Sequence, residues 1–155
     1  MRTWGLRGQT PFIQETFGWK SLSVIAGMTL WNFYFQIHSG SIKGPQVVEF
    51  LQALLRHLGV RVLVIWDGAA IHRCQLVQDF MRSTHGQLDL ARLPAYAPEL
   101  NPVEYLWAHL KEHELGNLIA RQAWELKMHA TAALRRMRRR PRIILACFAQ
   151  AELWP

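Results

Sequence analysis

Apolar residues along the chain follow two patterns, which are short β-branched or aromatic runs and longer stretches with helical spacing. Two short runs, Lys20–Gly27 and Asn32–His38, predict the strands of a β-hairpin, because only a tight stretch separates them. Pro45–Leu58 then places valines and leucines on one helical stripe, with a proline suited to the first turn. Gly59 predicts the end of this helix.

The middle of the chain alternates between the same two patterns. Val60–Trp66 is a nearly continuous β-branched run, which predicts a central strand covered on both faces. Ile71–Arg82 has helical spacing and Leu88–Leu93 predicts another short strand. This alternation of strands and helices indicates an α/β fold.

Prolines divide the C-terminal part into separate elements. The proline-rich connection 94–102 leads into a helix expected to run through Leu115, and one or two more helical stretches are expected within Leu118–Leu153. Pro141 should break or kink the helix there. The 155 residues suffice for a single domain, and residues 2–16 are expected to be an extended loop that enters the fold.

The formal net charge of +7 comes from an excess of basic residues, most of them arginine. Arginine suits phosphate groups, so a polyanionic partner is predicted, although a ribosomal protein, a membrane-surface protein or a generally basic proteome would give the same charge. The strongest candidates for phosphate contacts form one block, which contains Arg135, Arg136, Arg138, Arg139, Arg140 and Arg142.

The two cysteines, Cys74 and Cys147, lie in apolar stretches without a nearby partner and predict free core thiols. Such usage fits a reducing cytoplasm. No apolar run approaches membrane-spanning length, and the N-terminus lacks the apolar core of a signal peptide. We therefore expect a soluble, cytoplasmic protein without a membrane partner.

Asp67 directly follows the strand predicted over Val60–Trp66. Open α/β sheets present their ligands at the carboxyl ends of strands, so a carboxylate there can point into a crevice. An Asp-Gly turn at a strand end explains the residue equally well without any site.

Glu104 is the second candidate, three residues after Asn101. Asparagine is a good N-cap, Pro102 suits the first helical position, and a glutamate at the third position can be the partner in a capping box. That local role accounts for Glu104 without catalysis. It does not account for the stiff proline loop in front, which would hold the helix start in a fixed place.

Converging carboxylates would hold a pair of Mg²⁺ or Mn²⁺ ions, hard cations that favour oxygen ligands and leave room for phosphate. Such a pair supports an in-line displacement at phosphorus. The chain has no G-x-S-x-G elbow, no phosphate-cradling G-x-x-x-x-G-K-[ST] and no dinucleotide fingerprint, and a small-molecule cofactor is not expected.

A rival motif, H-x-x-E-H, spans His109–His113 and matches an inverted zinc-protease signature. Five residues match by chance fairly often, and no downstream glutamate lies in an obvious ligand-bearing helix. We expect these histidines to flank the carboxylate and to face DNA or solvent.

Two motifs resemble those of bacterial insertion-sequence transposases related to mariner, which carry a DDE triad on a ribonuclease-H-like fold. Residues 63–73 resemble the second-aspartate motif, and residues 93–107 resemble the motif of the final glutamate. Between Asp67 and Glu104 lie 36 residues, close to the family spacing. Residues 2–11 and 38–42 are also similar to family segments, so the resemblance covers nearly the whole chain.

The resemblance implies a mixed sheet flanked by helices and metal-dependent cleavage and strand transfer of DNA at transposon ends. It implies catalytic and metal-binding roles for Asp67 and Glu104. Positioning roles are expected for Asn101, Pro102 and His72. DNA contacts are expected from Arg73, Lys111 and the arginines at positions 135, 136, 138, 139, 140 and 142.

The resemblance also implies that something is missing before the first residues. In the family, the first aspartate lies on a strand just before a segment like residues 2–4, preceded by helix-turn-helix domains. Glu15 does not match that context. We expect an N-terminally truncated domain, inactive alone, with a two-metal site only when the first aspartate is supplied, and with a hydrophobic sheet edge that favours homodimers or a complementary segment. The alternative is a non-catalytic DNA-binding remnant or regulator of transposition.

Overall fold

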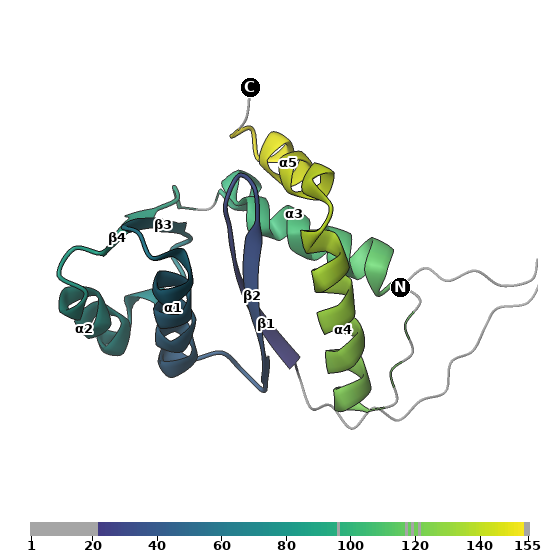
Figure 1. Ribbon diagram of the computed structural model, residues 1–155, viewed down its shortest axis with the longest axis horizontal. Helices are drawn as coiled ribbons and strands as arrows, with labels where there is room; N and C mark the ends of the chain where they lie inside the picture. Colours follow the sequence, from purple (N-terminus) through teal and green to yellow (C-terminus); the bar gives the residue numbers. More distant parts are fainter. Residues whose placement is uncertain (1–21, 96, 117, 119, 121, 154–155) are drawn as a thin grey trace, which may run out of the picture.

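The computed structural model describes residues 22–95, 97–116, 118, 120 and 122–153 of the chain (Figure 1). Two strands and a helix are followed by a strand, a helix and a strand, and then by the C-terminal helices. This order confirms the α/β class. The loop predicted over residues 2–16 lies outside the described residues.

The first element is the predicted hairpin. β1 (Leu22–Met28) pairs antiparallel with β2 (Phe33–Ser39) over their whole length. The connecting turn is closed by the backbone N–H of Thr29, which donates to the carbonyl of Asn32 over 2.7 Å. The Thr29 hydroxyl also accepts from the N–H of Asn32. The hairpin prediction is therefore confirmed.

The amphipathic helix follows as α1 (Gly44–Leu58), with Pro45 in its first turn. Its C-terminus is fixed by Gly59, which has a φ of 63° and donates its N–H to the carbonyl of Leu55. A positive φ is adopted easily only without a Cβ atom, so the glycine at this position ends the helix.

Two parallel strands form a second sheet, β3 (Val62–Trp66) and β4 (Leu88–Arg92). The crossover between them was predicted as one helix over residues 71–82. It contains instead a short 3-10 helix, η1 (Ala70–Arg73), and then α2 (Gln75–Ser83). The reason for the interruption is Cys74, whose extended backbone separates the two helices.

The prediction that β3 is covered on both faces is wrong for the described part of the chain. Val62, Val64 and Trp66 pack against α1 and α2, but Leu63 and Ile65 on the other face are each 59% exposed. Within that part, β3 pairs only with β4, and β1 pairs only with β2. The apolar run is present, but the described residues supply no layer to cover its second face.

The C-terminal part is helical, as predicted. α3 (Pro102–His109) continues as a π-helix, η3 (Leu110–Glu114), and is followed by α4 (Ala123–Arg138) and α5 (Pro141–Gln150). Pro141 separates the last two helices, because its ring cannot continue α4. Among the described helices, none is long and apolar enough to cross a membrane.

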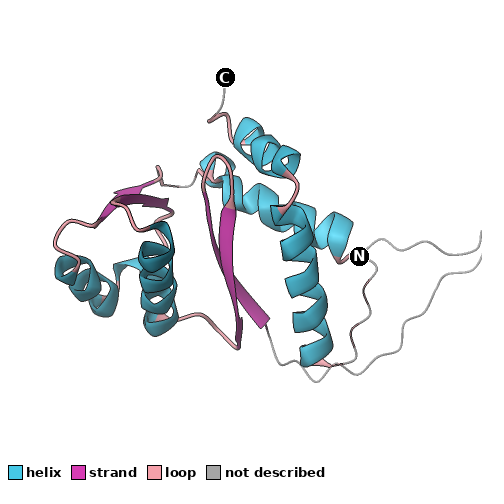
Figure 2. Ribbon diagram, in the orientation of Figure 1, coloured by secondary structure: helices cyan, strands magenta, loops and turns pink. Residues whose placement is uncertain are grey.

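The hairpin lies between two hydrophobic clusters. On one side, Phe33 packs with Leu106, Leu134 and Ile144 from the C-terminal helices. On the other side, Ile25 packs against the cluster formed by α1, α2, β3 and β4. Figures 1 and 2 show the same arrangement, with α1 and the parallel sheet on one side of the hairpin and α3 to α5 on the other. The hairpin therefore connects both halves of the core.

The two cysteines are free thiols, as predicted. Cys147 lies in the cluster of the C-terminal helices, where burial raises its pKa to about 11. Cys74 packs against the cluster around α1 and α2.

An ion-pair cluster fixes the end of η3 against the end of α4. The Glu114 side chain is only 9% exposed and lies 2.6 Å from a guanidinium nitrogen of Arg136. Arg140 approaches its other carboxylate oxygen at 3.6 Å. A nearly buried carboxylate is costly without partners, so these two arginines have a structural role.

We predict that Arg136→Gln lowers the melting temperature by roughly 3–6 °C, because Glu114 then keeps only the longer contact. Arg138→Gln is the matched control, since Arg138 is exposed and makes no ion pair within the described residues. Thermal unfolding followed by circular dichroism measures both variants. Equal melting temperatures for the two would contradict a stabilising role of the Glu114 cluster.

Candidate active site

The carboxyl end of β3 and the start of α3 line one open pocket of about 650 Å³. Asp67 follows the strand and Glu104 lies in the first turn of the helix. The structure therefore brings together the two acidic residues that the sequence predicted. The other lining residues are Gly68, Ala69, Arg73, Arg92, Leu93, Pro94, Ala95, Ala97, Pro98 and Asn101.

One carboxylate oxygen of Asp67 is held by its own turn. Oδ1 accepts a hydrogen bond from the backbone N–H of Ala69 over 3.0 Å and lies 3.4 Å from Nε2 of His72. The turn that the sequence offered as an alternative to a site is thus present. It uses Oδ1 alone, and Oδ2 has no hydrogen-bond partner among the described residues. Asp67 can serve the turn and still offer an oxygen to a ligand.

His72 is fixed beside Asp67 by stacking. Its ring lies against that of Trp66, with centroids 4.3 Å apart and planes 17° from parallel. Burial lowers the pKa of His72 more than the neighbouring Asp67 carboxylate raises it. The buried Nδ1 has no partner within the described part. In a neutral ring with its proton on Nε2, this N–H lies toward the Asp67 carboxylate, and the buried Nδ1 is an acceptor without a partner among the described residues.

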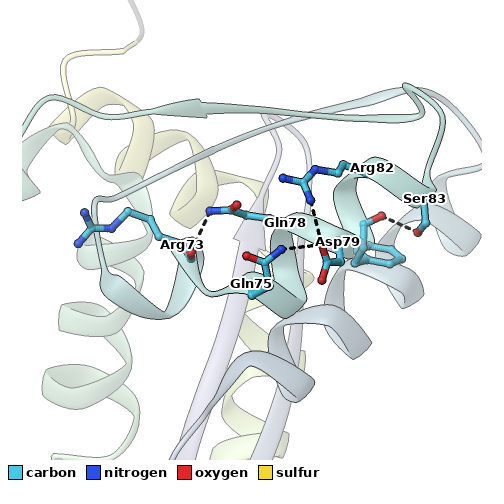
Figure 3. A network of polar contacts seen from close by, with 7 residues as sticks. Arg73, Gln75, Gln78, Asp79, Arg82 and Ser83 are labelled. Atoms are coloured by element: carbon cyan, nitrogen blue, oxygen red, sulfur yellow. Dashed lines mark hydrogen bonds and ion pairs between the residues drawn. The ribbon is translucent and has the colours of Figure 1, made fainter.

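Hydrogen bonds fix η1, which carries His72, to the following helix. Gln78 donates from Nε2 to the backbone carbonyl of Arg73 over 3.0 Å. Further along α2, Asp79 accepts from Gln75 and Arg82 (Figure 3). Figure 3 also shows that the Arg73 side chain points away from this network. The backbone of Arg73 is held while its guanidinium is left free.

Glu104 does not cap its own helix. The cap is Asn101, whose side-chain oxygen accepts from the N–H of Val103 over 3.2 Å. In a capping box, the Glu104 side chain would accept from the backbone N–H of Asn101. That N–H donates instead to the carbonyl of Pro98 over 3.0 Å. The exposed Glu104 carboxylate is therefore left to the pocket.

Of the basic residues predicted to contact DNA, Arg73 lines the pocket and the others lie elsewhere. Lys111 is exposed on η3. Arg136 and Arg140 contact Glu114. The remaining predicted arginines, Arg135, Arg138, Arg139 and Arg142, are exposed around the junction of α4 and α5.

Arg92 lines the same pocket and was missed by the sequence analysis. It ends β4, opposite Trp66 in the parallel register. A signal was available, because parallel strands end at one edge of a sheet and Arg92 ends the strand next to the one that leads to Asp67.

The His109–His113 motif does not form a metal site in the described part of the chain. The two rings lie 4.8 Å apart on α3 and η3. Burial, followed by the neighbouring His113, lowers the pKa of His109. No group of three or more His, Cys, Asp or Glu side chains among the described residues is placed to hold a metal ion. The zinc-protease alternative therefore lacks a third ligand among the described residues. Asp67 and Glu104 likewise have no third His, Cys, Asp or Glu beside them there.

A family model described as DDE superfamily endonuclease matches residues 1–127. The chain belongs to this superfamily. No curated protein matches the chain. This match covers both carboxylates of the pocket.

Solved structures of Mos1 mariner transposase have the same fold. The strand transfer complex matches with a TM-score of 0.61 and 15% identity, covering 100% of this chain and 51% of that one. The paired-end complex with Mn matches with a TM-score of 0.60 and 15% identity, covering 100% of this chain and 52% of that one. The isolated catalytic domain matches with a TM-score of 0.57 and 15% identity, covering 85% of this chain and 74% of that one. The chain thus spans about half the length of the Mos1 complexes.

These matches confirm the predicted family and fold. The chain is a member of the DDE superfamily, and it has the fold of the Mos1 catalytic domain, a ribonuclease-H-like arrangement of mixed strands and flanking helices. At this level of identity the structural likeness shows the fold alone.

We predict that Asn101→Ala lowers the free energy of unfolding by about 0.5–2 kcal/mol, because it removes the cap of α3. Glu104→Ala should change it by less than about 0.5 kcal/mol, as expected for an exposed side chain without a capping contact. Urea unfolding of the two variants measures both values. A loss for Glu104→Ala as large as that for Asn101→Ala would restore the capping role.

Proposed function

We propose that this chain is the catalytic domain of a bacterial insertion-sequence transposase that cleaves DNA strands and transfers them to a target. One observation carries the proposal: Asp67 and Glu104, which come from different elements, line one open pocket together with two arginines. Acidic side chains for metal ions and basic ones for phosphate are what phosphoryl transfer on DNA requires.

The residues at the pocket are suited to Mg²⁺ or Mn²⁺. Both acidic side chains are exposed carboxylates, and oxygen ligands of this kind are preferred by hard divalent cations. Solved Mos1 structures include a catalytic domain with Mg and a paired-end complex with Mn. When bound, such ions activate the attacking oxygen and stabilise the leaving oxygen at phosphorus.

The protein's own part in the reaction is to hold its carboxylates in place. Asp67 would use Oδ2, since His72 and the N–H of Ala69 occupy Oδ1. Glu104 is positioned by the Asn101 cap and by Pro102, which fixes the first turn of α3. Removal of Asn101 or His72 should therefore weaken metal binding by misplacing a carboxylate.

We propose that a third carboxylate completes the site and that it comes from a strand that enters between β1 and β3. Each of these strands pairs on only one side within the described residues. Both pack against one hydrophobic cluster, because Ile25 of β1 and Val64 of β3 contact it. A strand inserted there would join the two small sheets into one. It would also cover part of the exposed edge of β3.

We predict that the chain alone does not nick supercoiled DNA in Mg²⁺ or Mn²⁺, and that a form extended upstream by an acidic strand does. Asp67→Asn and Glu104→Gln in the extended form should each lower the nicking rate at least about 100-fold, because each removes a metal ligand. Gel electrophoresis of the plasmid measures the rate.

Three outcomes have different meanings. Cleavage by the extended form that both substitutions abolish supports the catalytic assignment of Asp67 and Glu104. Cleavage by the short chain means that another acid completes the site. If neither form cuts although both bind DNA, the catalytic proposal is wrong.

A second function from a different class is a non-catalytic DNA-binding regulator that associates with intact transposase. The exposed apolar face of β3 and the exposed arginines near the α4–α5 junction favour it. Asp67→Asn separates the two, because it would leave regulation and DNA retention unchanged and would abolish only catalysis. Replacing Arg138 and Arg139 by alanine should weaken DNA retention under either function.

We predict that the chain self-associates through β3, since Leu63 and Ile65 are exposed and the strand carries no charged residue to oppose edge pairing. Leu63→Lys with Ile65→Lys should shift the protein toward monomer in light scattering. Val60→Lys is the matched control, because Val60 is 63% exposed but lies outside the strand. A monodisperse monomer of the unchanged chain would contradict the prediction.

A further inference from the structure

Arg92 has a fixed place beside Asp67. It is the last residue of β4 and lies opposite Trp66 in the parallel ladder. The next hydrogen bond, from the N–H of Leu93 to the carbonyl of Trp66, is 2.9 Å long and closes the ladder. The backbone of Arg92 is therefore held next to the turn that carries Asp67, and its side chain lines the pocket.

Arg73 reaches the same pocket from a different element. It ends η1, and the Gln78 side chain holds its backbone carbonyl. Its guanidinium is exposed and points away from α2 (Figure 3). Two arginines from separate elements thus meet at one pocket, each with a fixed backbone and a free side chain.

Neither of these arginines is paired with an acidic residue in the described part of the chain. Several other arginines are: Arg61 lies 2.7 Å from Asp89 and Arg82 lies 3.0 Å from Asp79. Arg73 and Arg92 form no ion pair although two carboxylates line the same pocket. Their donors remain available for an anion that enters from outside.

We propose that Arg73 and Arg92 form a phosphate clamp that binds the backbone of the DNA strand entering the pocket. The proposal rests on the proposed function and adds the residues that hold the substrate. A guanidinium presents several N–H donors in a plane and binds phosphate oxygens with charge-assisted hydrogen bonds. The clamp leaves Asp67 and Glu104 to the metal ions.

A clamp of this kind fixes position and carries no sequence information. Phosphate oxygens are the same at every nucleotide, so contacts to them orient the strand but do not read bases. The clamp should therefore bind any sequence, with an affinity that falls as salt rises. Recognition of transposon ends must come from other parts of the protein.

The test measures binding of the full chain to a fluorescent 20-base-pair duplex of mixed sequence, in EDTA, over a series of salt concentrations. Arg73→Gln and Arg92→Gln should each weaken binding roughly 3- to 10-fold and reduce the slope of log affinity against log salt by about 1. Arg92→Lys should keep most of the slope, because it keeps the charge. Arg61→Gln is the control, since Arg61 is exposed, paired with Asp89 and absent from the pocket.

Binding constants and salt slopes equal to those of the unchanged chain, in variants with an unchanged melting temperature, would overturn the clamp. The absence of salt-dependent binding by the unchanged chain would overturn it as well. Because the assay contains no metal, it is independent of catalysis. A protein that cuts DNA while both glutamine variants bind normally has the proposed function without the clamp. A protein that loses affinity in both variants but never cuts has the clamp without the activity.

Discussion

The hydrogen bond from the N–H of Leu93 to the carbonyl of Trp66 closes the parallel ladder at the edge where β3 and β4 both end. Parallel pairing brings the two carboxyl ends to the same edge, so the residues that follow them become neighbours although the whole crossover separates them in sequence. Asp67 and Arg92 owe their proximity to this pairing. The proline-fixed start of α3 then adds Glu104 from the other side of the pocket.

Among the described residues, the acidic and basic side chains that line the pocket form no ion pairs with one another. Asp67 commits one oxygen to its turn and keeps the other free, and Glu104 leaves capping to Asn101. Arg73 and Arg92 have no acidic partner there. All four side chains are exposed, so water stabilises their charges and ligands of opposite sign can replace that water. Metal cations and a phosphodiester are a complementary pair of such ligands.

The sequence predicted the hairpin, α1 and β4, because in each the apolar spacing alone determines which face is buried. It could not decide whether Glu104 caps its helix, since a cap and a metal ligand share the same local pattern, and only the partner of the Asn101 N–H shows that the cap is not formed. It missed Arg92 because a single arginine at a strand end carries no periodic signal, and its place beside Asp67 follows only when β4 is paired parallel to β3. The interruption at Cys74 depends on one extended residue, which helical spacing does not reveal.

The one wrong prediction about burial has a physical meaning. The run of Val62–Trp66 is as apolar as a strand that is covered on both faces, and yet Leu63 and Ile65 remain exposed. The apolar pattern shows that β3 is suited to burial on both faces, although the described residues bury only one of them. The same strand leads to Asp67, one of the two carboxylates that line the pocket. In the function proposed above, a single additional strand that ends in an acid would pair with the free edge of β3 and supply the site at the same time.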